Sequence, residues 1–239
     1  MLVAAFTTED HATPSEAIVP VAAGRGGAAE GLLQGLVGGT VRTFEAKEHI
    51  FREGDAVSHV YKVEIGHVCI YKMLPDGRRQ VIDFAYPGDM IGLGAMGEHA
   101  NNALATSRTR IRCVPVAVLH RTIRDNAQLG LKLYEAVSRE LTAARELLFT
   151  VCQRTATERI AAFLLALSRR SERNNEDALE FVLPMTRVDI ADFLGLTIET
   201  VSRTFTKLRT EGVIDLSQSV LVSIEDIDRL KDLADGRSH

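Results

Sequence analysis

The 239-residue chain has few of the residues that carry metal, disulfide or covalent chemistry. Its three cysteines, Cys69, Cys113 and Cys152, lie far apart and form no CxxC motif. This excludes a disulfide framework or a zinc ribbon and fits a reducing cytosol. No GxSxG, HExxH or HxH motif occurs, and the histidines between positions 49 and 120 are dispersed. We therefore expect no catalytic residue, no metal ligand, no cofactor and no enzymatic activity.

Long apolar runs and a strong excess of one charge are also missing. No run of apolar residues is long enough for a transmembrane helix, and the N-terminus lacks the basic region of a signal peptide. We therefore expect no membrane partner and a cytoplasmic location. The net charge of -4 excludes a strongly basic, histone-like DNA binder but leaves room for binding through a local patch.

What is present divides the chain into four segments. Residues 1–40 are rich in Ala, Gly and Thr, and we interpret them as a mobile arm that ends in one short helix. Residues 41–124 alternate short apolar runs with glycine turns, which is typical of an antiparallel β-sandwich or barrel, here a β-roll. The runs that we expect to form strands are 60–65, 68–71, 80–84, 111–114 and 116–119.

A helical period replaces this alternation over residues 125–153. Apolar residues there follow a 3-4-3-4-3 spacing, which is the seam of about three heptads of a coiled coil. A helix packed only on its own domain is the alternative, but a seam of this length after a complete β-domain favours a dimerisation helix. The seam residues are Tyr134, Val137, Leu141, Ala144, Leu148 and Val151. Cys152 follows them, and we interpret it as a buried packing residue rather than a redox switch.

Residues 154–239 carry the most informative pattern, a helix-turn-helix. A further helix comes first, with Thr155 or Thr157 as its N-cap. Thr186 then opens the first helix of the motif, Gly195 provides the turn, and Thr197 caps the second helix. Two apolar runs at 213–216 and 220–224 predict a β-hairpin that flanks the second helix as a wing. The sequence thus predicts an α+β fold: a β-roll, a long helix and a winged helix.

The outward residues early in the second helix of the motif are candidates for reading DNA bases. Arg can pair with guanine, Glu can accept from cytosine, Ser can donate or accept, and Ile can touch a thymine methyl group. These base-reading candidates are Ile198, Glu199, Ser202 and Arg203. Side chains and helix N-termini nearby suit phosphate contacts. The phosphate-contacting candidates are Thr157, Thr186, Arg187, Thr197, Thr200 and Lys207.

This arrangement resembles the CRP/FNR superfamily of transcription regulators over residues 41–235. Within it, Pro87-Gly-Asp-Met-Ile-Gly and Leu183-Pro-Met-Thr-Arg-Val-Asp-Ile-Ala-Asp-Phe-Leu-Gly-Leu-Thr-Ile-Glu-Thr-Val-Ser-Arg look most like the FixK group, rhizobial activators of microaerobic respiration and nitrogen-fixation genes. The resemblance implies a homodimer on a TTGA–N6–TCAA palindrome, with RNA polymerase as a partner. It implies that Glu199, Ser202 and Arg203 read the half-site and that Thr157 and Arg187 contact phosphates.

Departures from the family bear on regulation. Leu93, Ala103 and Leu104 stand where members that bind cyclic AMP keep an acidic residue and an Arg-Ser pair, so we expect no cyclic nucleotide. Residues 1–68 contain no cysteine, so an iron–sulfur cluster held as in the oxygen-sensing members is not expected. Thr186 stands where some FixK proteins have a redox-sensitive cysteine. We expect control through synthesis or turnover.

Three alternatives stay open beside this interpretation. One is a ligand-gated regulator of the same fold that senses haem, nitric oxide or a metabolite. Another is a β-roll sensor or adaptor that does not bind DNA, against which Glu199, Ser202 and Arg203 argue. The third is a dinucleotide site at the GxGxxG of residues 92–97, which is disfavoured because no acidic residue follows at the required distance.

Overall fold

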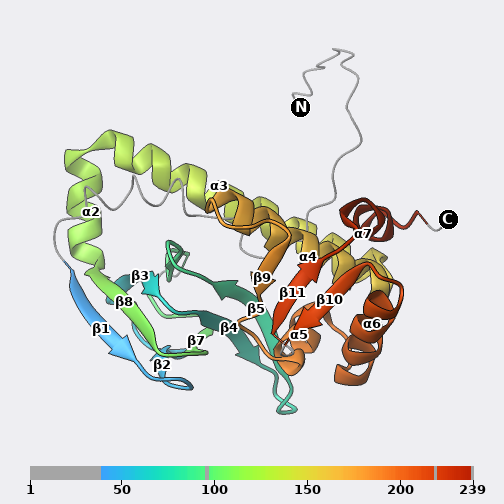
Figure 1. Ribbon diagram of the computed structural model, residues 1–239. Helices are drawn as coiled ribbons and strands as arrows, with labels where there is room; N and C mark the ends of the chain where they lie inside the picture. The colour runs from blue at the N-terminus through green and yellow to red at the C-terminus, as the bar shows by residue number, and fades with distance from the viewer. Residues whose placement is uncertain (1–38, 95–96, 218–219, 238–239) are drawn as a thin grey trace, which may run out of the picture.

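The computed structural model describes residues 39–94, 97–217 and 220–237, and the predicted arm with its short helix lies almost wholly outside them. Figure 1 shows a β-roll and a winged helix joined by one long helix. The strands are β1 Thr40–Phe44, β2 His49–Phe51, β3 His59–Ile65, β4 Val68–Met73, β5 Arg79–Ala85, β6 Met90–Ile91, β7 Asn102–Ala105, β8 Thr109–Pro115, β9 Glu180–Val182, β10 Ile214–Ser217 and β11 Leu221–Ile224. The helices are α2 Val116–Asp125, α3 Ala127–Gln153, α4 Ala156–Arg173, α5 Arg187–Leu194, α6 Ile198–Thr210 and α7 Ile227–Ala234.

Two antiparallel four-stranded sheets form the β-roll. Their strand orders are β1-β8-β3-β6 and β2-β7-β4-β5. Side chains from both sheets alternate between an inner, buried face and an outer face, so that Phe44, Val63, Val68 and Ile111 meet in one core. The predicted β-roll is confirmed, and four of the five predicted runs are strands.

The prediction of a strand at Val116–Leu119 is wrong, because these residues begin α2. Pro115 ends β8 and precedes the helix, and Leu119 is the buried residue of its apolar face. A second helix, α3, starts directly afterwards. The Asn126 side chain accepts hydrogen bonds from the backbone N–H groups of Gln128 and Leu129, which caps the new helix and separates the two.

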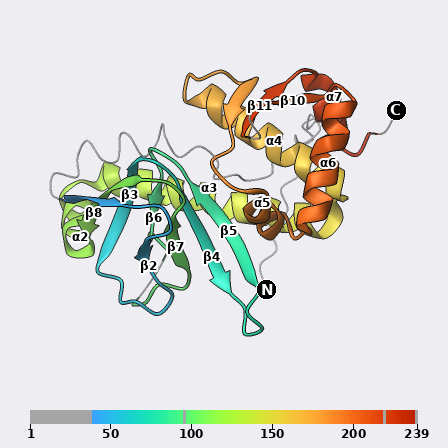
Figure 2. The same ribbon diagram turned by 60° about the horizontal axis from the view of Figure 1, so that its bottom comes forward.

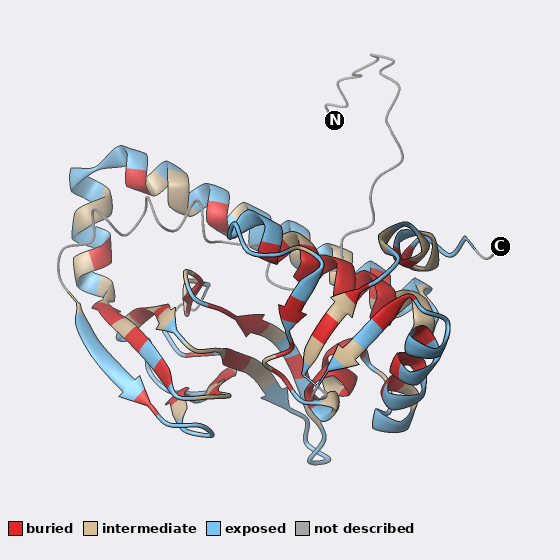
Figure 3. Ribbon diagram, in the orientation of Figure 1, coloured by how far each residue is buried: buried red, intermediate tan, exposed pale blue. Residues whose placement is uncertain are grey.

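The long helix α3 covers the β-roll and leads into the winged helix (Figure 1). Figure 3 shows that much of it is exposed, whereas α4 is largely buried. Leu129 and Ala136 face inward from α3.

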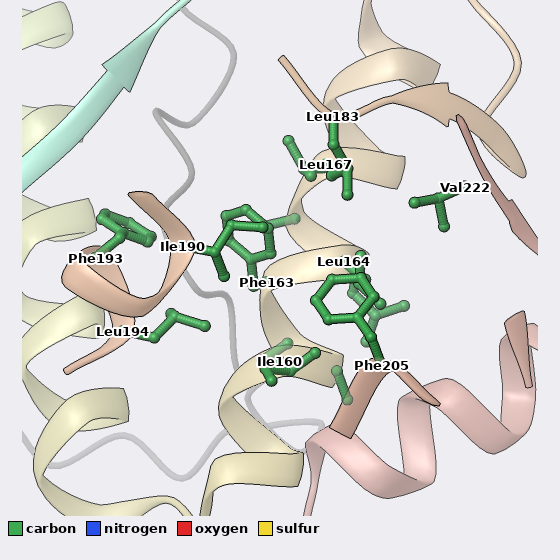
Figure 4. Packing of buried hydrophobic residues seen from close by; sticks show 14 of the residues in the cluster. Ile160, Phe163, Leu164, Leu167, Leu183, Ile190, Phe193, Leu194, Phe205 and Val222 are labelled. Atoms are coloured by element: carbon green, nitrogen blue, oxygen red, sulfur yellow. The ribbon is translucent and has the colours of Figure 1, made fainter. Parts of the chain in front are cut away.

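The winged helix is built around α4, whose central residues are almost completely buried. Figure 4 shows Phe163 and Leu164 of α4 among side chains from α5, α6 and the wing. The predicted hairpin of β10 and β11 is confirmed, and β9 adds a third strand to its sheet. The C-terminal helix α7, which packs on α4, was not predicted.

Candidate nucleic-acid interface

The first helix of the helix-turn-helix, α5, starts with the capping box that the sequence predicts. The Thr186 hydroxyl accepts a hydrogen bond from the Asp189 backbone N–H at 3.2 Å. In return, the Asp189 carboxylate accepts from the Thr186 backbone N–H at 2.9 Å and from its hydroxyl at 2.6 Å. Burial opposes ionisation of Asp189, but the bonds from Thr186 and then the Arg79 guanidinium outweigh it and lower the pKa of this carboxyl.

The turn between α5 and α6 depends on Gly195. Its φ of +63° lies in the left-handed region, where glycine is favoured. Arg159 of α4 stabilises the turn, because its Nη1 donates hydrogen bonds to the carbonyl oxygens of Leu194 at 2.9 Å and Gly195 at 3.4 Å. Sequence reasoning missed this role of Arg159, whose partners lie more than thirty residues away.

The second helix, α6, separates its side chains into a buried and an exposed face. Thr197 caps it by accepting a hydrogen bond from the Thr200 N–H at 3.2 Å. Val201, Phe205 and Leu208 are buried, as predicted. The four base-reading candidates lie together on the exposed face near the N-terminus of α6: Ile198, Glu199, Ser202 and Arg203.

This exposed face carries both charges. Hydrogen bonds from its own backbone N–H and from the Thr197 hydroxyl, together with the charge of Arg203, lower the pKa of Glu199. Glu199 is therefore an acceptor at neutral pH. One helical turn further, Arg203 offers donors. The face thus presents an acceptor and a donor side by side, which is the chemistry that distinguishes base edges in the major groove.

The phosphate-contacting candidates are not equally free. Thr186 and Thr197 use their hydroxyls as N-caps, so an anion would meet the helix N-termini there. The Arg187 guanidinium carbon lies 3.6 Å from the centroid of the Phe205 ring, and burial lowers the pKa of this arginine. Thr157, at the first turn of α4, and Thr200 are half-buried, whereas Lys207 is exposed.

The predicted dimerisation seam lies on α3 and is largely exposed in the single chain. Tyr134 is 72% exposed and Leu148 65%. Leu131 and Phe149, outside the predicted seam, are also exposed and widen the apolar stripe. A row of exposed apolar side chains on a helix is typical of a surface that binds another protein.

A cavity of about 520 Å³ lies between the β-roll and α3. Its walls are mostly apolar, with Ile70, Ile82 and Leu93 on the β-roll side and Leu147 on α3. Ala103 and Leu104, on which the expectation of no cyclic nucleotide rests, are part of β7. Neither supplies a charged or hydroxyl group that could hold a phosphate.

The cysteines differ in environment. Burial raises the pKa of Cys69 to about 12, and burial also raises the pKa of Cys113. The interpretation of Cys152 as a buried residue is wrong, because its side chain is exposed in the single chain. Among the described residues no cluster of His, Cys, Asp or Glu could hold a metal ion. None of the helices in that part of the chain combines the length and hydropathy needed to cross a membrane.

Known protein families match both halves of the chain. Residues 158–233 match the Crp-like helix-turn-helix domain, and residues 41–126 match the cyclic nucleotide-binding domain.

Individual relatives narrow this assignment. The nitrogen fixation regulation protein FixK of Bradyrhizobium diazoefficiens is 42% identical over 171 residues, 72% of each chain. FixK of Azorhizobium caulinodans is 40% identical over 196 residues, 82% of this chain and 79% of that one. The solved structure of FixK2 from Bradyrhizobium japonicum matches with a TM-score of 0.77 and 35% identity, over 82% of this chain and 98% of that one. The chain therefore belongs to the CRP/FNR superfamily and is a DNA-binding transcription regulator of the FixK type.

Proposed function

We propose that the protein is a homodimeric activator that reads a TTGA–N6–TCAA-like palindrome and controls microaerobic and nitrogen-fixation genes through contact with RNA polymerase in the cytoplasm. The observation that carries the proposal is the exposed face of α6, where Glu199, Ser202 and Arg203 stand clear of the protein core. The relatives named for nitrogen fixation support the choice of genes.

Each segment of the chain has a part in this proposal. Residues 41–124 are the β-roll, 125–153 the dimerisation helix and 154–239 the DNA-binding domain. Ile198, Glu199, Ser202 and Arg203 contact base edges. The phosphate contacts come from the N-terminal turns of α4, α5 and α6 and from Lys207, and they involve Thr157, Thr186, Arg187, Thr197 and Thr200.

Two-fold symmetry of the DNA site requires two copies of α6. The stripe on α3 supplies the apolar surface for pairing, through Tyr134, Val137, Leu141, Ala144, Leu148 and Val151. A second copy of the same stripe would cover these side chains and place the two α6 helices on one face of the dimer. In this proposal the protein acts without cyclic nucleotide, because the residues that would anchor the nucleotide are missing. It also acts without an iron–sulfur cluster, because the N-terminal cysteines that would hold the cluster are missing.

The proposal is tested by a gel shift on a duplex that carries TTGA–N6–TCAA, with a duplex of scrambled half-sites as the control. We expect a shift only with the first duplex. Residues 151–239 contain 12 Lys and Arg against 15 Asp and Glu, so we expect a modest dependence of affinity on salt. A dimeric protein that leaves the palindrome unshifted at low salt contradicts the proposal.

The cavity beside α3 favours one second candidate, a regulator of the same type gated by a small apolar ligand. A gel shift repeated with haem or with a nitric oxide donor separates the two. Binding that is the same with and without each addition supports the ungated activator, and binding that requires one of them supports the gated regulator.

A further inference from the structure

The winged helix and the β-roll share one hydrophobic core. Side chains of β4 and β5, among them Cys69, Val81 and Phe84, pack in the same cluster as the buried residues of α4, α5 and α6. The rings of Phe84 on β5 and Phe193 on α5 lie 5.4 Å apart between their centroids. Figure 2 shows α5 between β5 and α6. The DNA-binding domain therefore packs on the β-roll along β5, with β4 beside it.

Arg79, the first residue of β5, connects the β-roll to α5. Arg79 Nε donates to the Asp192 carboxylate at 2.8 Å, and its Nη2 donates to the Asp189 carboxylate at 2.5 Å. The neighbouring Gln80 donates through Nε2 to the Asp192 carbonyl oxygen at 2.5 Å. Asp189 is also the capping residue of α5, so Arg79 reaches the start of the helix-turn-helix itself.

At the other end of β5, an arginine of the winged helix contacts the β-roll. Its partner Asp89 lies in the turn that follows the strand. Arg170 Nη2 of α4 lies 3.1 Å from the Asp89 carboxylate, and the two side chains are 4% and 0% exposed. The guanidinium carbon of Arg170 is 4.1 Å from the centroid of the Tyr86 ring. Such a buried, stacked arginine has a fixed geometry, which a surface pair would lack.

The two contacts lie at opposite ends of β5. The strand has seven residues, so its two ends are about 20 Å apart at the usual rise of a β-strand. One point of attachment would leave the winged helix free to pivot about it, whereas two points and the apolar contact between them fix its orientation. A fixed orientation of α6 relative to α3 is what a dimer needs to present two recognition helices at one spacing.

We propose that β5 is the docking strand of the DNA-binding domain and that Arg79 and Arg170 are positioning residues for DNA recognition. They hold α5 and α4 on the β-roll, so side chains of the chain itself set the orientation of α6. Neither arginine touches DNA. This inference rests on the proposed function in that it takes the dimer on a palindrome as the active form.

The test compares Arg79→Ala with Arg78→Ala. Arg78 is the matched control, because it is the next residue and its partner is Asp76 in the same hairpin. We expect Arg79→Ala to bind the palindromic duplex roughly tenfold more weakly than the wild type and Arg78→Ala to match the wild type. We expect Arg79→Lys to recover part of the affinity. The double variant Arg79→Ala/Asp192→Ala should bind no more weakly than Arg79→Ala alone, because both changes remove the same contact.

A second test measures the distance between the β-roll and α6 in the absence of DNA. Its result does not depend on whether the protein binds the palindrome. Spin labels at Thr43→Cys on β1 and Arg209→Cys on α6, both exposed positions, are introduced with Cys152→Ser. Labelled protein is diluted with unlabelled protein, so that distances within one protomer dominate. We expect one narrow distribution for the otherwise unchanged chain and for Arg78→Ala, and a broadened or shifted one for Arg79→Ala.

An unchanged distance distribution in Arg79→Ala overturns the inference, whether or not the wild type binds the palindrome. Unchanged affinity of Arg79→Ala on a duplex that the wild type binds overturns it as well. Failure of the wild type to bind, combined with a broadened distribution in Arg79→Ala, contradicts the proposed function but leaves the docking role standing.

Discussion

Glu199 and Arg203 lie one helical turn apart on the exposed face of α6, where the Arg203 Nε donates to the Glu199 carbonyl oxygen at 3.4 Å. This bond is long and exposed, so it costs little to break. Both side chains are therefore available to a base edge, and the backbone of α6 keeps their separation fixed.

Replacing Arg203 by alanine tests the base-reading role. We expect a loss of about 1–3 kcal/mol of binding free energy on the palindrome, together with a weaker preference for guanine at the contacted position. Fluorescence anisotropy on duplexes with each base at that position measures both. Arg209→Ala is the control on the same helix, at its C-terminal end, and we expect a much smaller loss. An equal loss on all sequences would assign Arg203 to the phosphate backbone.

Replacing Leu141 by aspartate tests the dimer. Leu141 is exposed in the single chain, so the change leaves the protomer core intact and puts a carboxylate into the proposed apolar interface. We expect sedimentation equilibrium to give a monomer. Thr142→Asp, the next residue and outside the seam, should stay dimeric. A dimer in both variants would place the interface elsewhere.

Replacing Arg170 by methionine tests the buried pair with Asp89. The change leaves a carboxylate buried without its guanidinium, and we expect the free energy of unfolding to fall by about 3–5 kcal/mol. Chemical denaturation followed by circular dichroism measures it, with the exposed Arg173→Met as the control. We expect Arg170→Met/Asp89→Leu to regain part of the loss, because it removes the uncompensated charge as well. A loss below 1 kcal/mol in Arg170→Met would show that the pair is not buried in solution.

The pH dependence of stability tests the environment of His67. Burial, and then the positive charge of Arg170, lower the pKa of this histidine from 6.5 to about 4. Between these two values the unfolded chain binds a proton that the folded chain does not. Stability therefore falls as the pH drops from 6.5 towards 4, and it is fully present above 6.5. Because the ring is partly exposed, we expect this histidine to contribute about 2 kcal/mol of the loss.

Thermal or chemical unfolding at several pH values compares the wild type with His67→Gln. We expect the variant to lose less stability on acidification. Some dependence should remain, since burial also lowers the pKa of His49 and His99. His120→Gln, at an exposed position, should follow the wild type. Identical pH curves for His67→Gln and the wild type would contradict the assignment.

The sequence is sufficient to predict the elements whose signals are local. Glycine turns and alternation locate β3, β4, β5 and β8. Thr186 with Asp189 marks the start of α5, because a capping box is formed by neighbours in the chain. Val116–Leu119 is misassigned because a short apolar run fits a strand or a helix equally well. The edge strand β1 carries no alternation, since four of its five residues are exposed.

Contacts between distant residues could not be predicted in this way. Arg79 and Asp192 are 113 positions apart, and no pattern in the sequence pairs them. The stacking of Arg187 on Phe205 could not be predicted either. The helical spacing of the apolar residues predicted only that Phe205 lies on the inner face of α6. One local signal was overlooked: Asp226 caps α7, and Ile227, Leu230 and Leu233 follow at helical spacing.

The central claim, that two α6 helices of one dimer read half-sites one turn of DNA apart, is tested most directly by varying the spacing of the half-sites. Affinities are measured by anisotropy for TTGA–Nn–TCAA duplexes with five, six or seven intervening base pairs and for a single half-site. Six base pairs place the half-site centres about ten base pairs apart, one turn of the double helix. The account predicts tightest binding there, and binding weaker by roughly tenfold or more for the other three duplexes. Equal affinity for all four duplexes would contradict it.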